Sequence, residues 1–180
     1  MSTSGLTDND FEMLDLIDED DKVICQMEKA KVHSGIKVLH REIGVLIYDH
    51  DERVLLQQRS FKKKFFPGSW TTTAVGHVPA GKTPEEAAHM ELMEELGFDT
   101  DLTFVEKRKY VSDDHISLGF LFVGKFPHTA VITLDKDEVE QAKFVTHLEI
   151  STMNRNGQID YHTVETLEKF YHKVFTTLPK

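Results

Sequence analysis

The segment from residue 76 to residue 98 constrains the fold of this chain more than any other. It combines a glycine-bearing loop with the start signals of a helix: Thr83 as N-cap, Pro84 at the first helical position and Glu86 at the third. Gly97 then supplies a residue that readily adopts the left-handed conformation in which many helices end. The sequence therefore predicts a loop followed by a helix that begins after Thr83 and ends at Gly97.

Segments rich in β-forming residues lie on both sides of this helix. Before it, two pairs of segments flank polar turns and predict two β-hairpins, at residues 11–17 with 22–27 and at residues 42–48 with 54–58. The β character returns at residues 71–75. After the helix, the pattern predicts strands at residues 102–111, 116–124 and 142–146 and a short helix at residues 147–154.

A last helix is expected after Asp160, with an apolar stripe formed by Val164, Leu167, Phe170, Tyr171 and Val174. Strands mixed with helices in a chain of 180 residues favour a layered α/β fold. We expect one domain over residues 11–180, preceded by a polar, disordered leader at residues 1–10.

Composition limits the partners that this chain can have. It carries 21 Lys and Arg against 31 Asp and Glu, so its formal net charge of -10 disfavours binding to a nucleic-acid backbone. Cys25 is the only cysteine, which excludes an intrachain disulfide. We see neither a signal peptide nor an apolar stretch of membrane-spanning length, and we expect a cytoplasmic protein without a membrane partner.

Three glutamates near the end of the predicted helix carry the strongest chemical signal. At about 100° per residue, Glu91, Glu94 and Glu95 fall within roughly one third of the helix circumference, beside an apolar arc that includes Leu92. Like charges in this arrangement repel, so a hard divalent cation, Mg²⁺ or Mn²⁺, is expected among them. The alternative interpretation is a surface helix whose acidic side is solvated.

The same segment resembles the Nudix box, a loop-helix motif in which conserved glycines and glutamates have fixed spacing. The residues in register are Gly76, Glu91, Leu92, Glu94, Glu95, Gly97 and Phe98. The resemblance implies a Nudix α/β/α sandwich with a mixed β-sheet, in which Glu91, Glu94 and Glu95 are metal ligands or, for one of them, the base that activates water. Lys82 replaces the first glutamate of the motif and Met90 replaces its arginine.

Outside the box, the chain is similar to the isopentenyl diphosphate isomerase branch of this superfamily. In residues 55–70, Arg59 and Lys63 match basic positions that bind a diphosphate in that branch, and Gly76 is expected to lie beside the substrate. Three lysines in a row at residues 62–64 are also typical of an exposed, solubilising loop. Glu138 lies in an acidic run that related proteins share, and its role stays open.

Three histidines match a metal site of the isomerases. His33 and His40 stand seven residues apart and His77 follows Gly76, as the resemblance requires, so the three residues are candidate ligands of a second metal. Two glutamates complete the site in the isomerases, and residues 113–117 contain no clear counterpart of them. Packed or surface histidines are the alternative interpretation.

The residues favour hydrolysis over isomerisation. Isomerases use a cysteine immediately before the Gly-His pair, and this chain has Val75 there, which cannot exchange a proton. We therefore expect metal-dependent cleavage of a phosphoanhydride linkage in a nucleoside diphosphate or a related small substrate. A second interpretation, suggested by Lys82 and Met90, is a Nudix-like domain that binds a nucleotide without turnover.

Overall fold

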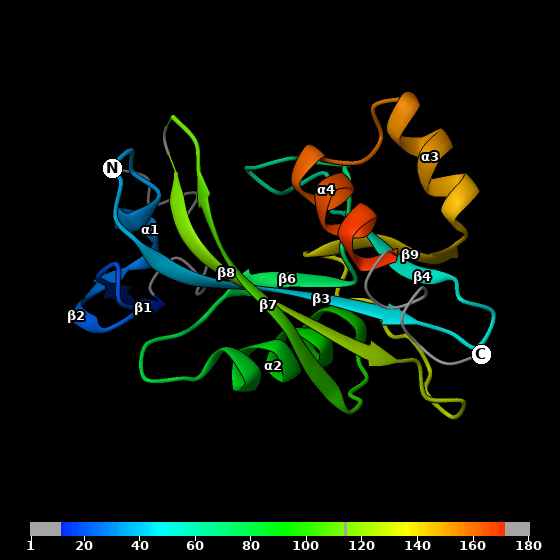
Figure 1. Cartoon of the computed structure of the whole chain (residues 1–180), viewed down its shortest axis with the longest axis horizontal. Helices are drawn as coiled ribbons and strands as arrows, with labels where there is room; N and C mark the ends of the chain where they lie inside the picture. Colours follow the sequence, from blue (N-terminus) through cyan, green and yellow to red (C-terminus); the bar gives the residue numbers. More distant parts are fainter. Residues whose placement is uncertain (1–11, 114, 172–180) are drawn as a thin grey trace.

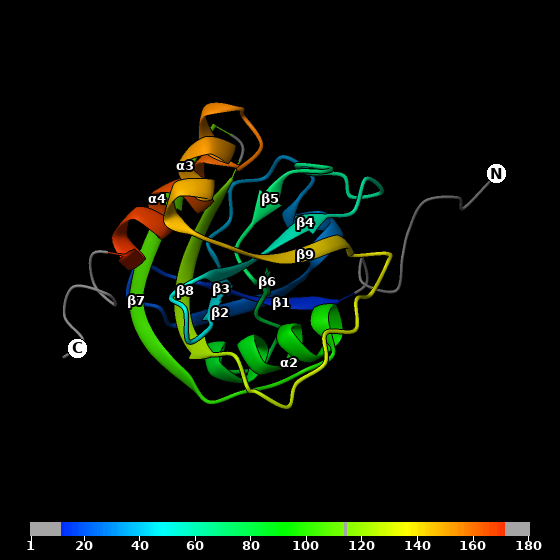
Figure 2. The same cartoon turned by 90° about the vertical axis from the view of Figure 1, so that its right-hand side faces the viewer.

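The computed structural model describes residues 12–113 and 115–171, which form three layers. In Figure 1 and Figure 2, helix α2 (Pro84–Leu96) covers one face of a β-sheet, and α3 (His147–Arg155) and α4 (Tyr161–Phe170) cover the other. This arrangement confirms the predicted α/β/α sandwich. The predicted leader at residues 1–10 lies outside the described residues.

The sheet is mixed, as predicted. Strand β3 (His40–Tyr48) pairs in parallel with β8 (Ile116–Lys125) along its whole length and pairs antiparallel with β1, β4 and β6. The remaining strands are β1 (Met13–Ile17), β2 (Val23–Glu28), β4 (Val54–Arg59), β5 (Trp70–Thr71), β6 (Ala74–His77), β7 (Leu102–Val111) and β9 (Val139–Val145). Because β3 has partners on both sides, its side chains meet residues from distant parts of the chain.

Both predicted hairpins are confirmed, since β1 pairs antiparallel with β2 and β3 pairs antiparallel with β4. The helix α1 (Lys29–Val32) directly follows β2 and was not predicted. It is four residues long, so it is too short to show a helical period in the sequence.

The β segment predicted at residues 71–75 is divided in two. Strand β5 ends at Thr71 and β6 begins at Ala74, because Thr73 inserts its side chain between the neighbouring strands. Its hydroxyl donates to the Leu55 carbonyl (2.5 Å) and accepts from the Ile47 amide (2.8 Å). A buried side chain thus takes the place of a backbone partner at this point.

Helix α2 begins and ends as the sequence predicts. The Thr83 hydroxyl accepts from the Glu86 amide while the Glu86 carboxylate accepts from the Thr83 amide, and Gly97 closes the helix at φ 72°. The buried side of α2, which includes Ala88 and Leu92, packs against β3 through Ile43. The Nudix-like segment is therefore fixed to the centre of the sheet.

The two C-terminal helices bury the opposite face. A capping box at Thr146 starts α3, and the Asp160 carboxylate accepts from the Thr163 amide at the start of α4. Leu167 and Phe170 lie in a core cluster with Leu46 of β3, whereas Val174 of the predicted stripe lies outside the described residues. Within residues 12–113 and 115–171, no helix combines the length and the apolar character that a membrane span requires.

Candidate functional site

The glycine at residue 76 lies where β6 meets helix α2. A β-carbon at this position would overlap the carboxyl group of Glu91, so only glycine leaves room for that side chain. Gly76 pairs with Ile43 of β3, which packs against α2, so both residues lie on the helix side of the sheet. The residue that the sequence placed beside the substrate therefore has a clear structural role, which is to let an acidic side chain of α2 approach the sheet.

The three predicted glutamates differ in their surroundings. Glu95 is buried, and its Oε2 accepts hydrogen bonds from Gln57 Nε2 (2.8 Å) and the Val75 amide (3.3 Å). Glu91 is half-buried, and Glu94 is exposed. Since residues 94 and 95 are separated by about 100° around the helix, the two cannot both face the sheet.

Burial has a strong effect on two of these carboxyl groups. It raises the pKa of Glu95 to about 8, although the hydrogen bonds from Gln57 and Val75 act in the opposite direction. Burial and the charge of Glu95 raise the pKa of Glu91 well above its ordinary value. A cation placed beside them would favour their ionised forms, so this pair suits a positively charged ligand.

The two departures from the motif are both at the surface. Lys82, which precedes α2, forms an exposed i,i+4 pair with Glu86 of the first turn, with 3.4 Å between Lys82 Nζ and Glu86 Oε1. Met90 is an exposed apolar side chain on the same helix. Neither residue disturbs the packing of α2 on the sheet, so the helix keeps its position without the two motif side chains.

The two predicted phosphate-binding cations lie at the end of β4 and in the loop after it. Arg59 Nε donates to the Phe65 carbonyl (3.1 Å), and Lys63 forms an ion pair with Glu138. The charge of Arg59 acts to lower the pKa of Glu95, which opposes the larger effect of burial. Arg59 is therefore within electrostatic reach of the buried carboxylate of α2.

The structure gathers the three histidines whose assignment rested on resemblance alone. His33 follows α1, His40 begins β3 and His77 ends β6, and their ligand atoms all lie within 4.8 Å of one another. His33 Nε2 is 2.9 Å from His77 Nε2. The carboxylates of Glu91, Glu94 and Glu95 are not among the candidate metal-binding groups of this kind in the described chain. The histidines are therefore the more compact set of potential ligands.

Two further residues join this histidine cluster and were missed in the sequence. Glu42 pairs across the strands with His77, and its Oε1 lies 3.3 Å from His115 Nε2 and 3.7 Å from His40 Nε2. His115 comes from the segment at residues 113–117, in which no glutamate counterpart was found. Among the residues that the structure describes, the cluster contains one carboxylate, and it comes from β3.

The protonation of the cluster suits a metal ion. His40 Nδ1 lies 2.9 Å from the Val38 carbonyl, which can only accept, so Nδ1 carries a hydrogen and Nε2 offers a lone pair in the neutral ring. His40 Nε2 is buried and has no hydrogen-bond partner among the described residues. Because its lone pair faces the Glu42 carboxylate, a cation between the two would satisfy both atoms.

Electrostatics in the cluster point the same way. Burial, followed by the charge of His40, lowers the pKa of His33 to about 4, and burial holds the pKa of His77 well below its ordinary value. Burial would raise the pKa of Glu42, but the hydrogen bond from His115 and the charges of the nearby histidines outweigh it and hold that pKa well below normal. The neutral imidazoles of His33 and His77 beside an ionised carboxylate are donors that transition metals bind.

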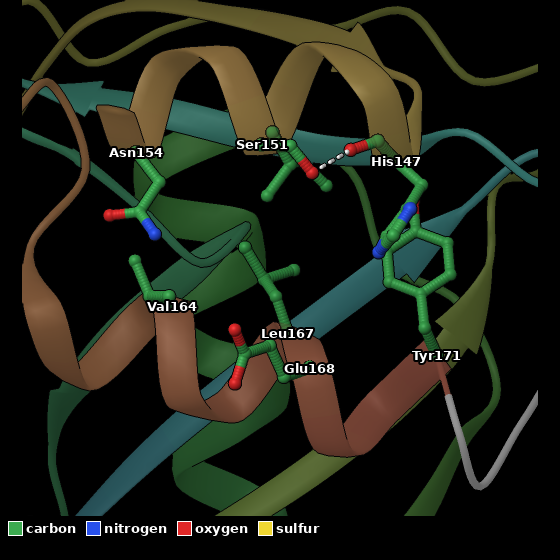
Figure 3. A pocket seen from close by; sticks show the side chains of 8 residues that line it. His147, Ser151, Asn154, Val164, Leu167, Glu168 and Tyr171 are labelled. Carbon is green, nitrogen blue, oxygen red and sulfur yellow. Dashed lines mark hydrogen bonds between the residues drawn. The ribbon is translucent and has the colours of Figure 1, made fainter. Parts of the chain in front are cut away.

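A small pocket lies between α3 and α4, and Figure 3 shows its lining. Ser151 and Asn154 reach it from α3, Glu168 reaches it from α4, and the Ser151 hydroxyl donates to the His147 carbonyl (3.0 Å). None of the predicted site residues lines this pocket. The candidate site therefore lies at the other two clusters.

Known proteins are similar to this chain in sequence and in fold. Residues 38–167 match the NUDIX domain model. An isopentenyl-diphosphate Delta-isomerase of Photorhabdus laumondii is 34% identical over 158 residues, which cover 85% of this chain and 87% of that protein. An uncharacterized Nudix hydrolase of Listeria monocytogenes is 34% identical over 124 residues, which cover 67% of this chain and 71% of that protein.

Among solved structures, the DR0079 protein of Deinococcus radiodurans has a TM-score of 0.74 at 19% identity, covering 89% of this chain and 99% of that chain. At this identity the likeness concerns the fold alone. Together with the loop, the helix and the histidine cluster, these matches show that the chain belongs to the NUDIX family, in the branch that resembles isopentenyl-diphosphate isomerases.

Proposed function

We propose that this protein is a metal-dependent hydrolase that cleaves the phosphoanhydride linkage of a nucleoside diphosphate or a related small diphosphate. The observation that carries the proposal is a pair of neighbouring carboxylates, the half-buried Glu91 beside Gly76 and the buried Glu95 within electrostatic reach of Arg59. The glutamates of such a site can bind a cation, and its arginine can bind an anion. A complex of a diphosphate with Mg²⁺ or Mn²⁺ meets both needs.

Each residue has a separate task in this proposal. Glu91, Glu94 and Glu95 would hold the cation, with Glu95 oriented by Gln57 and Val75. Arg59 and Lys63 would bind phosphate oxygens. A bound Mg²⁺ or Mn²⁺ would neutralise the diphosphate and make water more acidic. Water then adds its oxygen to one phosphorus and its protons pass to oxygen atoms at the site as the bridging P–O bond breaks.

We further propose that the histidine cluster binds a second metal ion, a transition metal. His33, His40 and His77 would supply nitrogen ligands, and Glu42 and His115 would complete the set. The lone pair of His40 Nε2 that faces the Glu42 carboxylate supports this role. A site rich in nitrogen donors differs from the carboxylate site on α2 and suits a softer cation.

Isomerisation is the second candidate, because relatives with this activity in their names cover most of the chain. The residue before Gly76 argues against it. Val75 lies on β6 with its amide bound to Glu95, and its side chain has no exchangeable proton. Cys25 is exposed on β2, in another strand of the sheet. A non-catalytic nucleotide-binding domain is the remaining alternative.

The test is a panel of nucleoside diphosphates, nucleotide sugars and isopentenyl diphosphate, incubated with Mg²⁺, with Mn²⁺ and with chelator. The proposal expects metal-dependent release of phosphate or of a phosphorylated product from at least one hydrolysable member. Conversion of isopentenyl diphosphate to its isomer would instead establish the second candidate. No turnover of any member would favour a binding role.

A further inference from the structure

Two lysines of the loop after β4 form ion pairs with two neighbouring acids before β9. Lys62 pairs with Asp137, and Lys63 pairs with Glu138. The side chains of the first pair are 69% and 79% exposed, whereas those of the second are 28% and 29% exposed. The pairs have the same chemistry but different environments, and only the second is partly withdrawn from water.

Backbone hydrogen bonds hold both Lys63 and Glu138 in place. The Ser60 amide donates to the Glu138 carbonyl (2.9 Å), and the Lys63 amide donates to the Ser60 carbonyl (3.1 Å). Strands β4 and β9 also pair here, with Arg59 opposite Val139. Strand pairing and a tight turn therefore fix the relative positions of the Lys63 and Glu138 backbones.

The Glu138 side of this pair is also tied to helix α2. In the segment that precedes Glu138, the Asp135 amide donates to the Glu95 carbonyl (3.1 Å) and the Thr133 amide donates to the Leu96 carbonyl (2.8 Å). The charge of Glu138 is one of the influences that raise the pKa of Glu95. Glu138 thus interacts with both a buried carboxylate of α2 and a cation that we assign to the substrate.

Arg59 differs from Lys63 in one respect. No carboxylate of residues 12–113 and 115–171 forms an ion pair with the Arg59 guanidinium within 4.0 Å, so Arg59 is available to an incoming anion. Lys63 already holds an oxyanion. A phosphate group and a carboxylate both offer negatively charged oxygens to an ammonium group, so one can replace the other.

We propose that Glu138 occupies, in the free protein, the position on Lys63 that a phosphate group of the substrate takes on binding. The inference rests on the proposed function, because it assigns Arg59 and Lys63 to the diphosphate. Glu138 then competes with the ligand and sets its affinity. A diphosphate binds at Arg59 directly and at Lys63 only by displacing this carboxylate.

The test measures binding of methylenediphosphonate, a diphosphate analogue that water does not cleave, by titration calorimetry with Mg²⁺ and with chelator. Glu138→Gln removes the competitor and is expected to lower the Kd by about threefold to fivefold, the upper part of the range for ion pairs that remain in contact with water. Asp137→Asn is the matched control, since it removes the same charge one residue away. It is expected to leave the Kd within about twofold of the wild type.

A double substitution separates competition at Lys63 from a general change in charge. Lys63→Met is expected to weaken binding, and in that background Glu138→Gln should no longer tighten it. Glu138→Asp withdraws the carboxylate by one methylene group and should give an intermediate Kd. Thermal unfolding checks each variant, and the backbone bond from Ser60 to residue 138 is retained in all of them.

The inference is overturned if Glu138→Gln binds no more tightly than Asp137→Asn, if it tightens binding equally without Lys63, or if no variant binds the analogue. These outcomes are independent of catalysis. A protein that hydrolyses a diphosphate but shows no effect at position 138 keeps the proposed function and loses the inference. A protein whose affinity responds at position 138 but which cleaves nothing keeps the inference and loses the proposed function.

Discussion

At the scale of single residues, the proposed metal ligands of α2 include a carboxyl group that is buried and yet has to be ionised to bind a cation. Glu95 is buried, which disfavours its charge, yet it accepts two hydrogen bonds that orient one of its oxygens. Glu94 is exposed on the same helix. The proposed cation site therefore joins a buried, hydrogen-bonded ligand and an exposed one, and the two residues can be tested separately.

Replacing Glu94 or Glu95 by glutamine is expected to reduce turnover by about a hundredfold or more, because amides are weak ligands for hard cations. Glu95→Gln should keep or raise the melting temperature, since it removes a buried ionisable group while retaining an acceptor for Gln57. Product release and thermal unfolding measure the two effects. Glu85→Gln, at an exposed site in the first turn, is the control. Full activity of both variants would refute the metal assignment.

Met90 offers a gain-of-function test. The family motif has arginine at this position, and the exposed side chain of Met90 leaves room for one. Met90→Arg places a cation four residues from both Glu86 and Glu94, so activity is expected to stay the same or rise. Met93→Arg, at another exposed position of α2, is the control. A folded Met90→Arg protein with much lower kcat would contradict the expectation.

At the scale of elements, the success of the sequence predictions follows the range of the interactions involved. Helix α2 was predicted to the residue because Thr83, Glu86 and Gly97 fix its ends locally. The division of the segment at residues 71–75 was missed because Thr73 contacts Leu55 and Ile47, which lie in other strands. Local signals therefore define helix ends well, whereas breaks in strands depend on neighbours that the sequence does not identify.

The turn between β3 and β4 provides a stability test for one element. Asp49 is buried, and its carboxylate accepts from the amides of Asp51 (3.0 Å) and Arg53 (2.9 Å) and from Arg53 Nε (2.8 Å). Burial opposes ionisation, but the hydrogen bonds and the charge of Arg53 prevail and lower the pKa of Asp49. The contribution of this carboxylate is therefore present above its ordinary pKa and is lost as pH falls through the lowered value.

Asp49→Asn is expected to reduce the free energy of unfolding by roughly 1–3 kcal/mol near neutral pH, the range for hydrogen bonds to a charged group. The difference from the wild type should shrink at acidic pH, where Asp49 itself becomes protonated. Denaturant unfolding at several pH values measures it. Asp51→Asn, at an exposed position of the same turn, is the comparison. A constant difference across the pH range would show that the charge of Asp49 does not matter.

At the scale of the whole molecule, the histidine cluster joins segments that are far apart in the chain. Glu42 and His115 are separated by 73 positions and meet because β3 and β8 pair in parallel. Sequence motifs located His33, His40 and His77, but no local pattern indicated that Glu42 and His115 would complete the set. The one available signal was that Glu42 stands two residues after His40 and so shares its face of β3.

A metal that binds this cluster is expected to stabilise the whole fold, because it binds the folded chain and not the unfolded one. The melting temperature should therefore rise with added Zn²⁺ or Mn²⁺. Glu42→Gln should weaken metal affinity by about tenfold to a hundredfold, measured by titration with Co²⁺ and its absorption spectrum. His89→Ala, at a histidine on α2 outside the cluster, is the control. Equal affinity of the wild type and Glu42→Gln would exclude Glu42 as a ligand.

Gly76 and His77 are consecutive residues of β6, and successive residues of a strand face opposite sides of a sheet. Gly76 admits Glu91 from the side of α2, and His77 meets His33 and Glu42 on the other side. Strand β6 therefore separates the carboxylates of α2, on one face of the sheet, from the histidine cluster on the other. A one-residue shift in the register of β6 would turn Gly76 away from Glu91 and His77 away from His33. A single insertion between Ala74 and Gly76 is therefore expected to disrupt the carboxylate site and the histidine cluster together.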